Sequence, residues 1–228
     1  MTVLLLRLAG PMQSWGDSSR FANRNTRREP TKSGVLGLLA AAQGRRRTDE
    51  VEDLLALRFG VRTDQPGTIM RDFHTAHDRE GNSMPLSNRY YLADAVFVAA
   101  VSGDESLLEA LDAAIREPGF PLYLGRRSCP VVGKISLGLR EGDLIDELDA
   151  EPWHASAWHR KRSAPRVRLD VMVDAEEGQV GDVIRDVPLS FNPERRLYGW
   201  RTVQSFGVEK DNPDGTDEPD WLAALGGA

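Results

Sequence analysis

The chain has 228 residues, of which 40% are hydrophobic and 28% charged, with a formal net charge of −6; these proportions are ordinary for a soluble globular protein of one large domain, or of one domain plus a small second one. The longest apolar run, 35–42, is far too short to span a bilayer. The N-terminus lacks the basic start and the cleavage site of a signal peptide, so we expect a cytoplasmic protein with no membrane partner. One cysteine, Cys129, excludes an intramolecular disulfide and a multi-cysteine metal site, and we expect no cofactor.

The first fifth of the chain predicts a strand, a long loop and a helix. Residues 2–9 are a near-continuous apolar run, which is typical of a central strand with both faces buried. Residues 12–29 are polar, carry several arginines and show no periodicity, so we expect a loop. Thr31 or Ser33 can then cap a helix whose apolar positions extend over 35–42.

Strand and helix patterns follow one another through the middle of the chain. In order, they predict a helix at 50–57, strands at 59–62, 68–75 and 90–101, a helix at 104–116, a loop at 118–130 and a strand at 134–140. The series strand, helix, strand, strand, helix, strand is the ferredoxin-like βαββαβ plan. We therefore predict an α+β fold with a ferredoxin-like core over 1–140, whose antiparallel sheet leaves one face free for a ligand.

The last third of the chain differs in its residue pattern from the part before it. Residues 141–151 are acidic and predict a helix or a loop, whereas 166–173 and 198–206 predict strands. We expect a smaller β-rich part over 141–210. The remaining segment, 211–228, is acidic and contains Pro and Gly, which predicts a mobile tail.

Residues 76–87 form a polar connection that is longer than a hairpin needs. Met84 and Leu86 are apolar residues there with no obvious core to join, and Arg79 and Arg89 flank them. A projecting hairpin with such a tip can separate stacked bases while its arginines hold phosphates. The alternative is a surface loop without contacts.

Basic residues are clustered although the chain is acidic overall. A local basic groove, and not the total charge, decides whether a protein contacts phosphates. The alternative is a set of solvated faces on a mixed-charge surface. The clusters contain Arg20, Arg24, Arg27, Arg28, Lys32, Arg45, Arg46 and Arg47, then Arg126 and Arg127, and then Arg160, Lys161, Arg162, Arg166 and Arg168.

Four segments in order resemble the CasD-type RAMP proteins, which are RNA-binding subunits of the type I-E CRISPR Cascade complex. They are LRLAGPMQSWG at 6–16, PTKSGVLGLLA at 30–40, RDFHT at 71–75 and YLGRRSCP at 123–130. The resemblance implies a ferredoxin-like (RAMP/RRM-like) core, a projecting thumb hairpin near 76–89, and a position at the 5′ handle of the CRISPR guide RNA. It also implies contacts with the Cascade backbone subunits and the large subunit, and an indirect contact with target DNA.

The residues predicted to bind RNA come from these segments and from the basic clusters. Lys32 and Ser33 open a helix, whose free N–H groups attract phosphate or simply form an ordinary cap. The glycine at 125 lets backbone approach a phosphate beside two arginines, or the loop is a solvated turn. Trp15 can stack on a base or pack in the core. The full set is Met12, Gln13, Trp15, Arg24, Arg27, Lys32, Ser33, Arg71, His74, Arg89, Arg126, Arg127 and Ser128.

Histidine could also give the chain a catalytic role. Metal-free RNA cleavage needs a general base and a cation, and His74 with Arg71 or Lys32 could supply them. A sister branch of the resembled family cleaves its guide precursor with a tyrosine, a lysine and a histidine, but this chain lacks a clear Lys-His pair. We therefore expect a non-catalytic guide-RNA-binding subunit, with a metal-independent endoribonuclease as the alternative. A generic protein-interaction domain is a third hypothesis.

Overall fold

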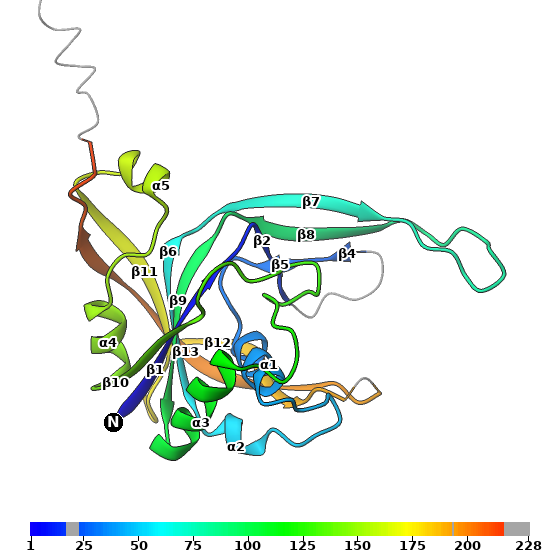
Figure 1. The fold of residues 1–228 in the computed structure, drawn as a ribbon, viewed down its shortest axis with the longest axis horizontal. Coiled ribbons are helices and arrows are strands. Elements are labelled where there is room, and N and C mark those ends of the chain that lie inside the picture. Colours follow the sequence, from blue (N-terminus) through cyan, green and yellow to red (C-terminus); the bar gives the residue numbers. More distant parts are fainter. Residues whose placement is uncertain (17–22, 193, 217–228) are drawn as a thin grey trace, which may run out of the picture.

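Seven strands form one antiparallel sheet in the computed structural model, which describes residues 1–16, 23–192 and 194–216 (Figure 1). They are β1 (Thr2–Ala9), β6 (Arg58–Gln65), β9 (Val96–Gly103), β10 (Ser136–Glu141), β11 (Arg166–Asp174), β12 (Asp182–Ser190) and β13 (Leu197–Asp211). Their order in the sheet is β10-β1-β9-β6-β11-β13-β12. The helices are α1 (Lys32–Ala42), α2 (Glu52–Leu55), α3 (Glu105–Arg116), α4 (Leu144–Ala150) and α5 (Ala157–Lys161). The fold is therefore α+β, as predicted, and no helix in the described part of the chain is long and apolar enough to cross a membrane.

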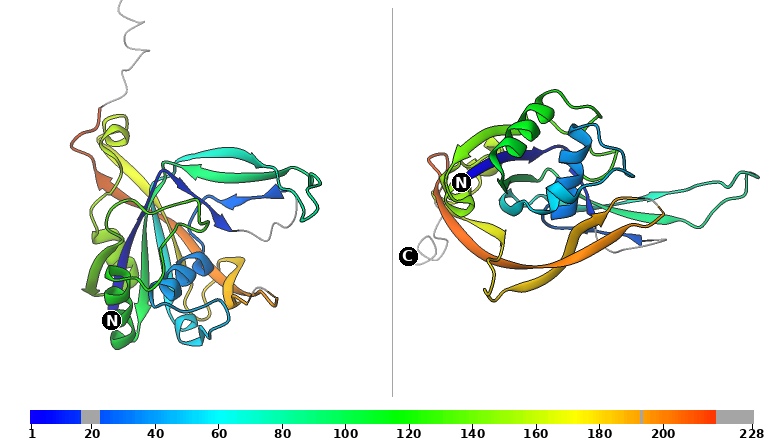
Figure 2. Two further views of the ribbon diagram at one scale, coloured as in Figure 1. Left: turned by 45° about the vertical axis from the view of Figure 1, so that its right-hand side comes forward. Right: turned by 90° about the horizontal axis from the view of Figure 1, so that it is seen from below.

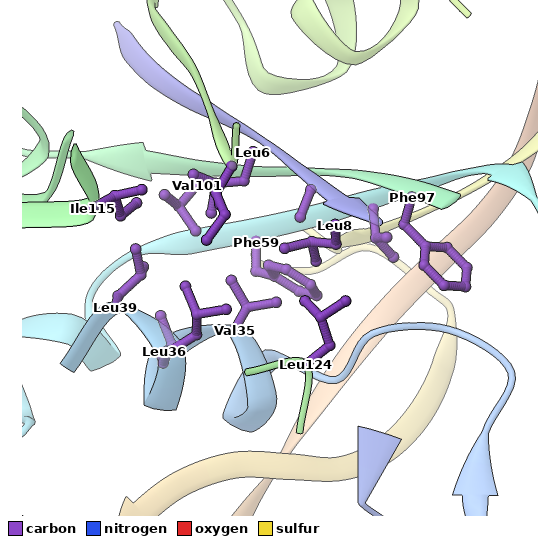
Figure 3. Packing of buried hydrophobic residues seen from close by; sticks show 14 of the residues in the cluster. Leu6, Leu8, Val35, Leu36, Leu39, Phe59, Phe97, Val101, Ile115 and Leu124 are labelled. Carbon is purple, nitrogen blue, oxygen red and sulfur yellow. The ribbon is translucent and has the colours of Figure 1, made fainter. Parts of the chain in front are cut away.

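Helices α1 and α3 cover one face of the sheet. Leu6 and Leu8 of β1 point to this face and pack in a buried cluster with residues of both helices (Figure 3). Thr31 is the N-cap of α1, since its Oγ1 accepts a hydrogen bond from the Gly34 N–H at 3.1 Å. Asp104 caps α3 in the same way. The predicted strand at 2–9 and the helices predicted over 35–42 and 104–116 are confirmed, and the helix predicted at 50–57 is the shorter α2.

The opposite face of the sheet is covered as well, so the expectation of a free face is wrong. Val3 and Leu5 of β1 point to this face, where they pack with Leu144 and Leu148 of α4. Val171 and Val173 of β11 complete the cluster. A strand that is apolar on both sides must bury both, and the 141–151 segment supplies the second cover as a helix.

The C-terminal strands extend the sheet beyond β6. Strand β11 pairs with β6 through Val171 to Val173, and the 15-residue β13 lies between β11 and β12. The extended sheet curls around toward α1, as the right-hand view in Figure 2 shows. The sequence did not predict β12, because the register shifts after Arg185 and after Pro188 and interrupts the alternation of side chains.

A hairpin of β7 (Thr68–His74) and β8 (Ser87–Ala93) projects from the body of the protein (Figure 1). The single strand predicted at 90–101 is in fact two strands in two sheets, β8 and β9. Asp94 lies between them with a φ of 56°, a left-handed conformation that turns the chain out of the sheet. Apolar residues on both sides of the turn concealed it in the sequence.

The described residues of the segment predicted as an irregular loop, 12–29, form four short strands. They are β2 (Met12–Gln13), β3 (Trp15–Gly16), β4 (Asn23–Arg24) and β5 (Thr26–Arg27). Strands β2 and β4 both pair with β8, β2 at the root of the hairpin and β4 farther out, and β3 pairs with β5. Residues 17–22, which include Arg20, and most of the predicted tail, 217–228, lie outside the described residues. Residues 211–216 are hydrogen-bonded to the 163–165 segment.

Candidate nucleic-acid interface

Three separate parts of the chain meet along β8, between the root of the β7–β8 hairpin at Ala93 and Arg89 farther out. Strand β4 pairs in parallel with β8, which places Arg24 opposite Arg89. Strand β2 pairs with the other end of β8, so Met12 lies opposite Ala93. The loop after Leu124 lies against both, since the Ser14 N–H donates to the Leu124 carbonyl at 3.1 Å. Basic residues that are distant in the sequence therefore share one surface.

Arg126 ties these parts together. Its Nη1 donates to the Tyr90 carbonyl at 3.0 Å, and its Nη2 donates to the Arg24 carbonyl at 2.8 Å. The guanidinium carbon lies 4.8 Å from the centroid of the Tyr91 ring, a cation–π distance. Sequence reasoning did not single out either tyrosine. Arg126 therefore positions the surface, and its hydrogen-bonding capacity is largely committed to the protein itself.

Gly125 explains how the loop can lie so close to Ser14. Its φ of 85° is left-handed, and a Cβ at this position would collide with the Ser14 carbonyl oxygen. The next residues, Arg127 and Ser128, are exposed. Within the described residues, the Arg127 guanidinium has no ion pair or hydrogen bond. Arg127 is thus the arginine of this loop that is free to contact a phosphate.

The hairpin register separates the predicted basic residues onto two faces. Residues directly opposite one another in a β-ladder point to the same side, and neighbours along a strand alternate. Arg89 lies opposite Asp72 and Arg71 lies opposite Tyr90, so Arg89 and Arg71 point to opposite faces. Arg24 lies opposite Arg89. The hairpin therefore brings Arg24 and Arg89 together and leaves Arg71 on the other face.

Arg89 shows an unmet hydrogen-bonding requirement. Its Nε is buried and has no acceptor among the described residues. A buried N–H of a guanidinium without an acceptor is costly, and a phosphate oxygen is a suitable acceptor. The face that carries Arg24 and Arg89 thus has two arginines and, among the described residues, one unused donor.

His74 and Asp72 lie on the same hairpin face as Arg89. The His74 Nε2 is 3.0 Å from the Asp72 Oδ2, and both side chains are partly exposed. Phe73, on the other face, is 64% exposed, and Met84 and Leu86 near the tip are exposed as well. The apolar residues predicted to have no core to join therefore do not enter one.

The hairpin tip closes on itself through Asp78. This carboxylate accepts hydrogen bonds from the Asn82 side chain and from the backbone N–H groups of Asn82 and Glu80, which holds the pKa of Asp78 below its ordinary value. His77 and Ser83 form an isolated β-bridge just outside this turn. The tip thus has local structure of its own.

Gln13 and Trp15 are fully buried, which corrects the expectation that they contact bases. The Gln13 Nε2 donates to the Ala95 carbonyl at 2.7 Å, and its Oε1 accepts from the Trp15 Nε1 at 3.0 Å. A Cβ on Gly34 would lie 2.7 Å from the Trp15 ring, so the ring packs directly on α1. Met12 is half-buried against the same core. These residues support the surface from beneath.

Lys32 is also buried, which corrects the expectation of a phosphate site at the start of α1. Its Nζ lies 2.8 Å from the Asp174 Oδ2, and its backbone N–H donates to the Asp186 carboxylate at 2.9 Å. A protein carboxylate thus occupies the place at which a phosphate was expected. Ser33 lies beside it, with its hydroxyl 3.3 Å from that of Thr31. The two aspartates are too distant in the sequence for a local pattern to reveal them.

Arg201 completes this buried network. It binds Asp186 through Nε at 2.6 Å and Asp174 through Nη1 at 2.5 Å. Burial by itself would lower the pKa of Arg201, but the hydrogen bonds and charges of the two aspartates raise it overall. The guanidinium therefore stays charged in the interior.

The other predicted residues contribute less to the surface. Arg27 is half-buried in β5, opposite Trp15. Cys129 is buried, and burial raises the pKa of its thiol, as expected of a small core residue. In the described ranges, no cluster of three or more His, Cys, Asp or Glu side chains could hold a metal ion.

Comparison with known proteins identifies relatives along most of the chain. A family model described as CRISPR-associated protein (Cas_Cas5) matches residues 3–204. A relative from Escherichia coli (strain K12), described as the CRISPR system Cascade subunit CasD, is 38% identical over 157 residues, which cover 59% of this chain and 70% of that protein.

Two solved structures agree with the sequence comparison. A crystal structure of a Cas protein is 38% identical with a TM-score of 0.72, covering 95% of this chain and 99% of the other. A chain of a CRISPR RNA-guided surveillance complex is 32% identical with a TM-score of 0.74, covering 96% of this chain and 95% of the other. The similarity therefore extends to the C-terminal strands, where the sequence motifs are weakest.

Proposed function

Because the chain belongs to the Cas5 family of CRISPR-associated proteins, we propose that it is the CasD-type subunit of a type I-E Cascade complex, which binds the 5′ handle of the guide RNA without cleaving it. The E. coli relative is a Cascade subunit, and one similar structure comes from an RNA-guided surveillance complex. Its partners are then the guide RNA, the Cascade backbone subunits and the large subunit, with target DNA as an indirect partner. A cytoplasmic location fits this role.

The strand order supports a ferredoxin-like core of the RAMP type. Strands β10-β1-β9-β6 form an antiparallel sheet in which the fourth strand in chain order lies beside the first, and the third lies beside the second. Helix α1 follows the first strand and α3 follows the third. The β7–β8 hairpin is inserted between the second and third strands of this core, which is the position expected for the thumb.

The observation that carries the proposal is the group of arginines gathered along β8 of the hairpin. Arg24, Arg89 and Arg127 come from three parts of the chain, and the Arg126 contacts hold these parts together. The Nε of Arg89 and the guanidinium of Arg127 lack acceptors within the described residues. The phosphates of a single-stranded RNA handle suit such donors.

The proposal predicts different effects for the two arginines of the 125–128 loop. Arg127→Ala should lower guide RNA retention without changing the circular dichroism spectrum, because it removes an exposed and uncommitted charge. Arg126→Ala should lower retention and also loosen the hairpin root, because it removes hydrogen bonds to the Tyr90 and Arg24 carbonyls.

The test is to co-express each variant with the other Cascade subunits and quantify the guide RNA per purified complex. Nuclease protection of the 5′ handle gives a second readout. Arg47→Ala is the matched control, since Arg47 is an exposed arginine remote in sequence from the hairpin. Wild-type retention and protection in both the Arg126→Ala and Arg127→Ala variants would disprove the proposed interface.

A further inference from the structure

A second basic and aromatic surface lies on α5, at the opposite end of the molecule from the hairpin tip (Figure 1). Trp158 is 50% exposed, and Lys161 and Arg162 are exposed beside it. An aromatic ring with lysine and arginine close by is a combination that can stack on a base and pair with the adjacent phosphates. Lys161 and Arg162 belong to the basic cluster found in the sequence at 160–168, and neither is part of the interface proposed at the hairpin.

The Trp158 ring has defined neighbours. The guanidinium carbon of Arg162 lies 5.7 Å from the ring centroid, within cation–π range. The His159 ring meets the Trp158 ring edge-on at 5.5 Å and also contacts Trp153 at 5.9 Å. Burial lowers the pKa of His159, against a smaller opposite effect of Asp94. The lowered pKa favours the neutral imidazole, so the lysine and the arginine are the cations of this surface.

Two of the cations at the end of α5 have no acidic partner in the described part of the chain. Within the described residues, Lys161 and Arg162 have no ion pair. Neighbouring Arg160 and Arg166, in contrast, pair with Asp214 at 3.0 Å and Asp211 at 3.5 Å. Among the described residues, Lys161 and Arg162 are therefore the cations of this surface that can pair with the phosphates of a polyanion.

The segment that carries Trp158 is anchored to the end of β6. The Trp153 Nε1 donates to the Asp64 carbonyl at 2.7 Å, and the Ser156 hydroxyl donates to the Gln65 Oε1 at 2.8 Å. From the other side, the Asn212 Nδ2 donates to the Arg160 carbonyl at 2.8 Å. A ring on a fixed support loses little conformational entropy when a ligand stacks on it.

We propose that Trp158, Lys161 and Arg162 bind a single-stranded polynucleotide at a site separate from the hairpin root. One base stacks on the indole, and the two cations hold the adjacent phosphates. The inference rests on the proposed function, because both assign nucleic acid as the partner. Guide RNA and a single strand of target DNA share this chemistry, so the experiment includes both.

The test uses the full-length chain and fluorescein-labelled oligo(U) and oligo(dT), with binding followed by fluorescence anisotropy at several NaCl concentrations. Trp158→Ala should weaken binding by about 10-fold, in line with the loss of one stacked base, and Trp158→Phe should retain most of the affinity. Lys161→Ala combined with Arg162→Ala should reduce the slope of log K against log[NaCl] by about 1.4, because two phosphate contacts are lost.

Trp200→Ala is the matched control. Trp200 is 66% exposed and also lies beside an arginine, since the Arg185 guanidinium carbon is 5.8 Å from its ring. It is on β13, outside the proposed site, so its replacement should not change the affinity. A stronger effect on oligo(U) than on oligo(dT) would assign the site to guide RNA, and the reverse to a DNA strand.

The outcomes separate this inference from the proposed function. If Trp158→Ala binds as wild type while Arg127→Ala weakens binding, the α5 site is wrong and the hairpin interface stands. If Trp158→Ala leaves oligonucleotide binding unchanged but reduces co-purification with other Cascade subunits, the surface is a protein contact and the inference is overturned. A wild-type chain that binds neither probe overturns both.

Discussion

Replacing Asp186 by alanine should destabilise the protein, because two buried groups share this carboxylate. It accepts hydrogen bonds from the Lys32 backbone N–H at 2.9 Å and from the Arg201 Nε and Nη2 at 2.6 and 2.9 Å. Only 3% of the Asp186 side chain and 7% of the Arg201 side chain are exposed, so water cannot take over these bonds without a rearrangement.

The size of the effect follows from the charge balance of the network. Lys32 and Arg201 are the cations, and Asp174 and Asp186 are the anions. Removing one carboxylate leaves an uncompensated buried positive charge, which costs about 3–5 kcal/mol. Because Arg201 keeps Asp174, we expect the lower end, about 3 kcal/mol. In Asp186→Asn the amide oxygen can still accept a hydrogen bond, so the cost should be smaller, about 1–3 kcal/mol.

Urea unfolding at pH 7, followed by circular dichroism, measures these differences in the free energy of unfolding. The control is Glu209→Ala, which removes only an exposed carboxylate 4.0 Å from Arg166 and should change stability by no more than about 0.5 kcal/mol. A loss below about 1 kcal/mol for Asp186→Ala would refute the reasoning, since it would mean that Arg201 is readily solvated or paired elsewhere.

Four further outcomes follow from the structure. Gly125→Ala should displace the loop at Ser14 and cost about 1–3 kcal/mol of stability, with weaker guide retention; unchanged retention and stability would contradict the assigned contact. His74→Ala should leave guide maturation unchanged when a separate processing subunit is present, and accumulation of uncut precursor in a normally assembled complex would favour the endoribonuclease alternative. Replacing 76–86 by a short Gly-Ser linker should preserve folding but weaken assembly or 5′ protection, because the tip supplies little buried apolar area; full assembly with wild-type protection would exclude a thumb function. Burial raises the pKa of Glu29, so ionisation of this carboxyl opposes folding, and stability falls as the pH rises from the unfolded-state pKa through the raised folded-state pKa. Glu29→Gln should therefore be more stable than wild type at pH 7 but not below pH 4, which urea titrations at the two pH values would show.

Local patterns in the sequence were sufficient to predict several elements. A two-sided apolar run specifies a central strand at Thr2–Ala9, and the hydroxyl residues Thr31 and Ser33 indicate where α1 begins. The amphipathic pattern at 104–116 specifies α3. The position of the hairpin was also predictable, because a polar connection between strand-like runs is a local feature.

Other features depend on residues that are distant in the sequence. Lys32 was predicted to contact phosphate, but Asp174 and Asp186 lie beside it only after the sheet has curled around α1. Trp15 could stack or pack, and its contact with Gly34 on α1 decides for packing. Neither outcome can be read from neighbouring residues.

The basic interface shows the same division. The sequence shows which arginines are available and which motifs contain them, since composition and short motifs are local properties. The tertiary structure decides which of them share a face: strand register unites Arg24 with Arg89 and turns Arg71 away, and the hydrogen bonds of Arg126 to backbone carbonyls commit it to the protein while Arg127 remains free. A register shift of one residue would reverse the faces without changing the composition, which is why pairing had to be seen in three dimensions.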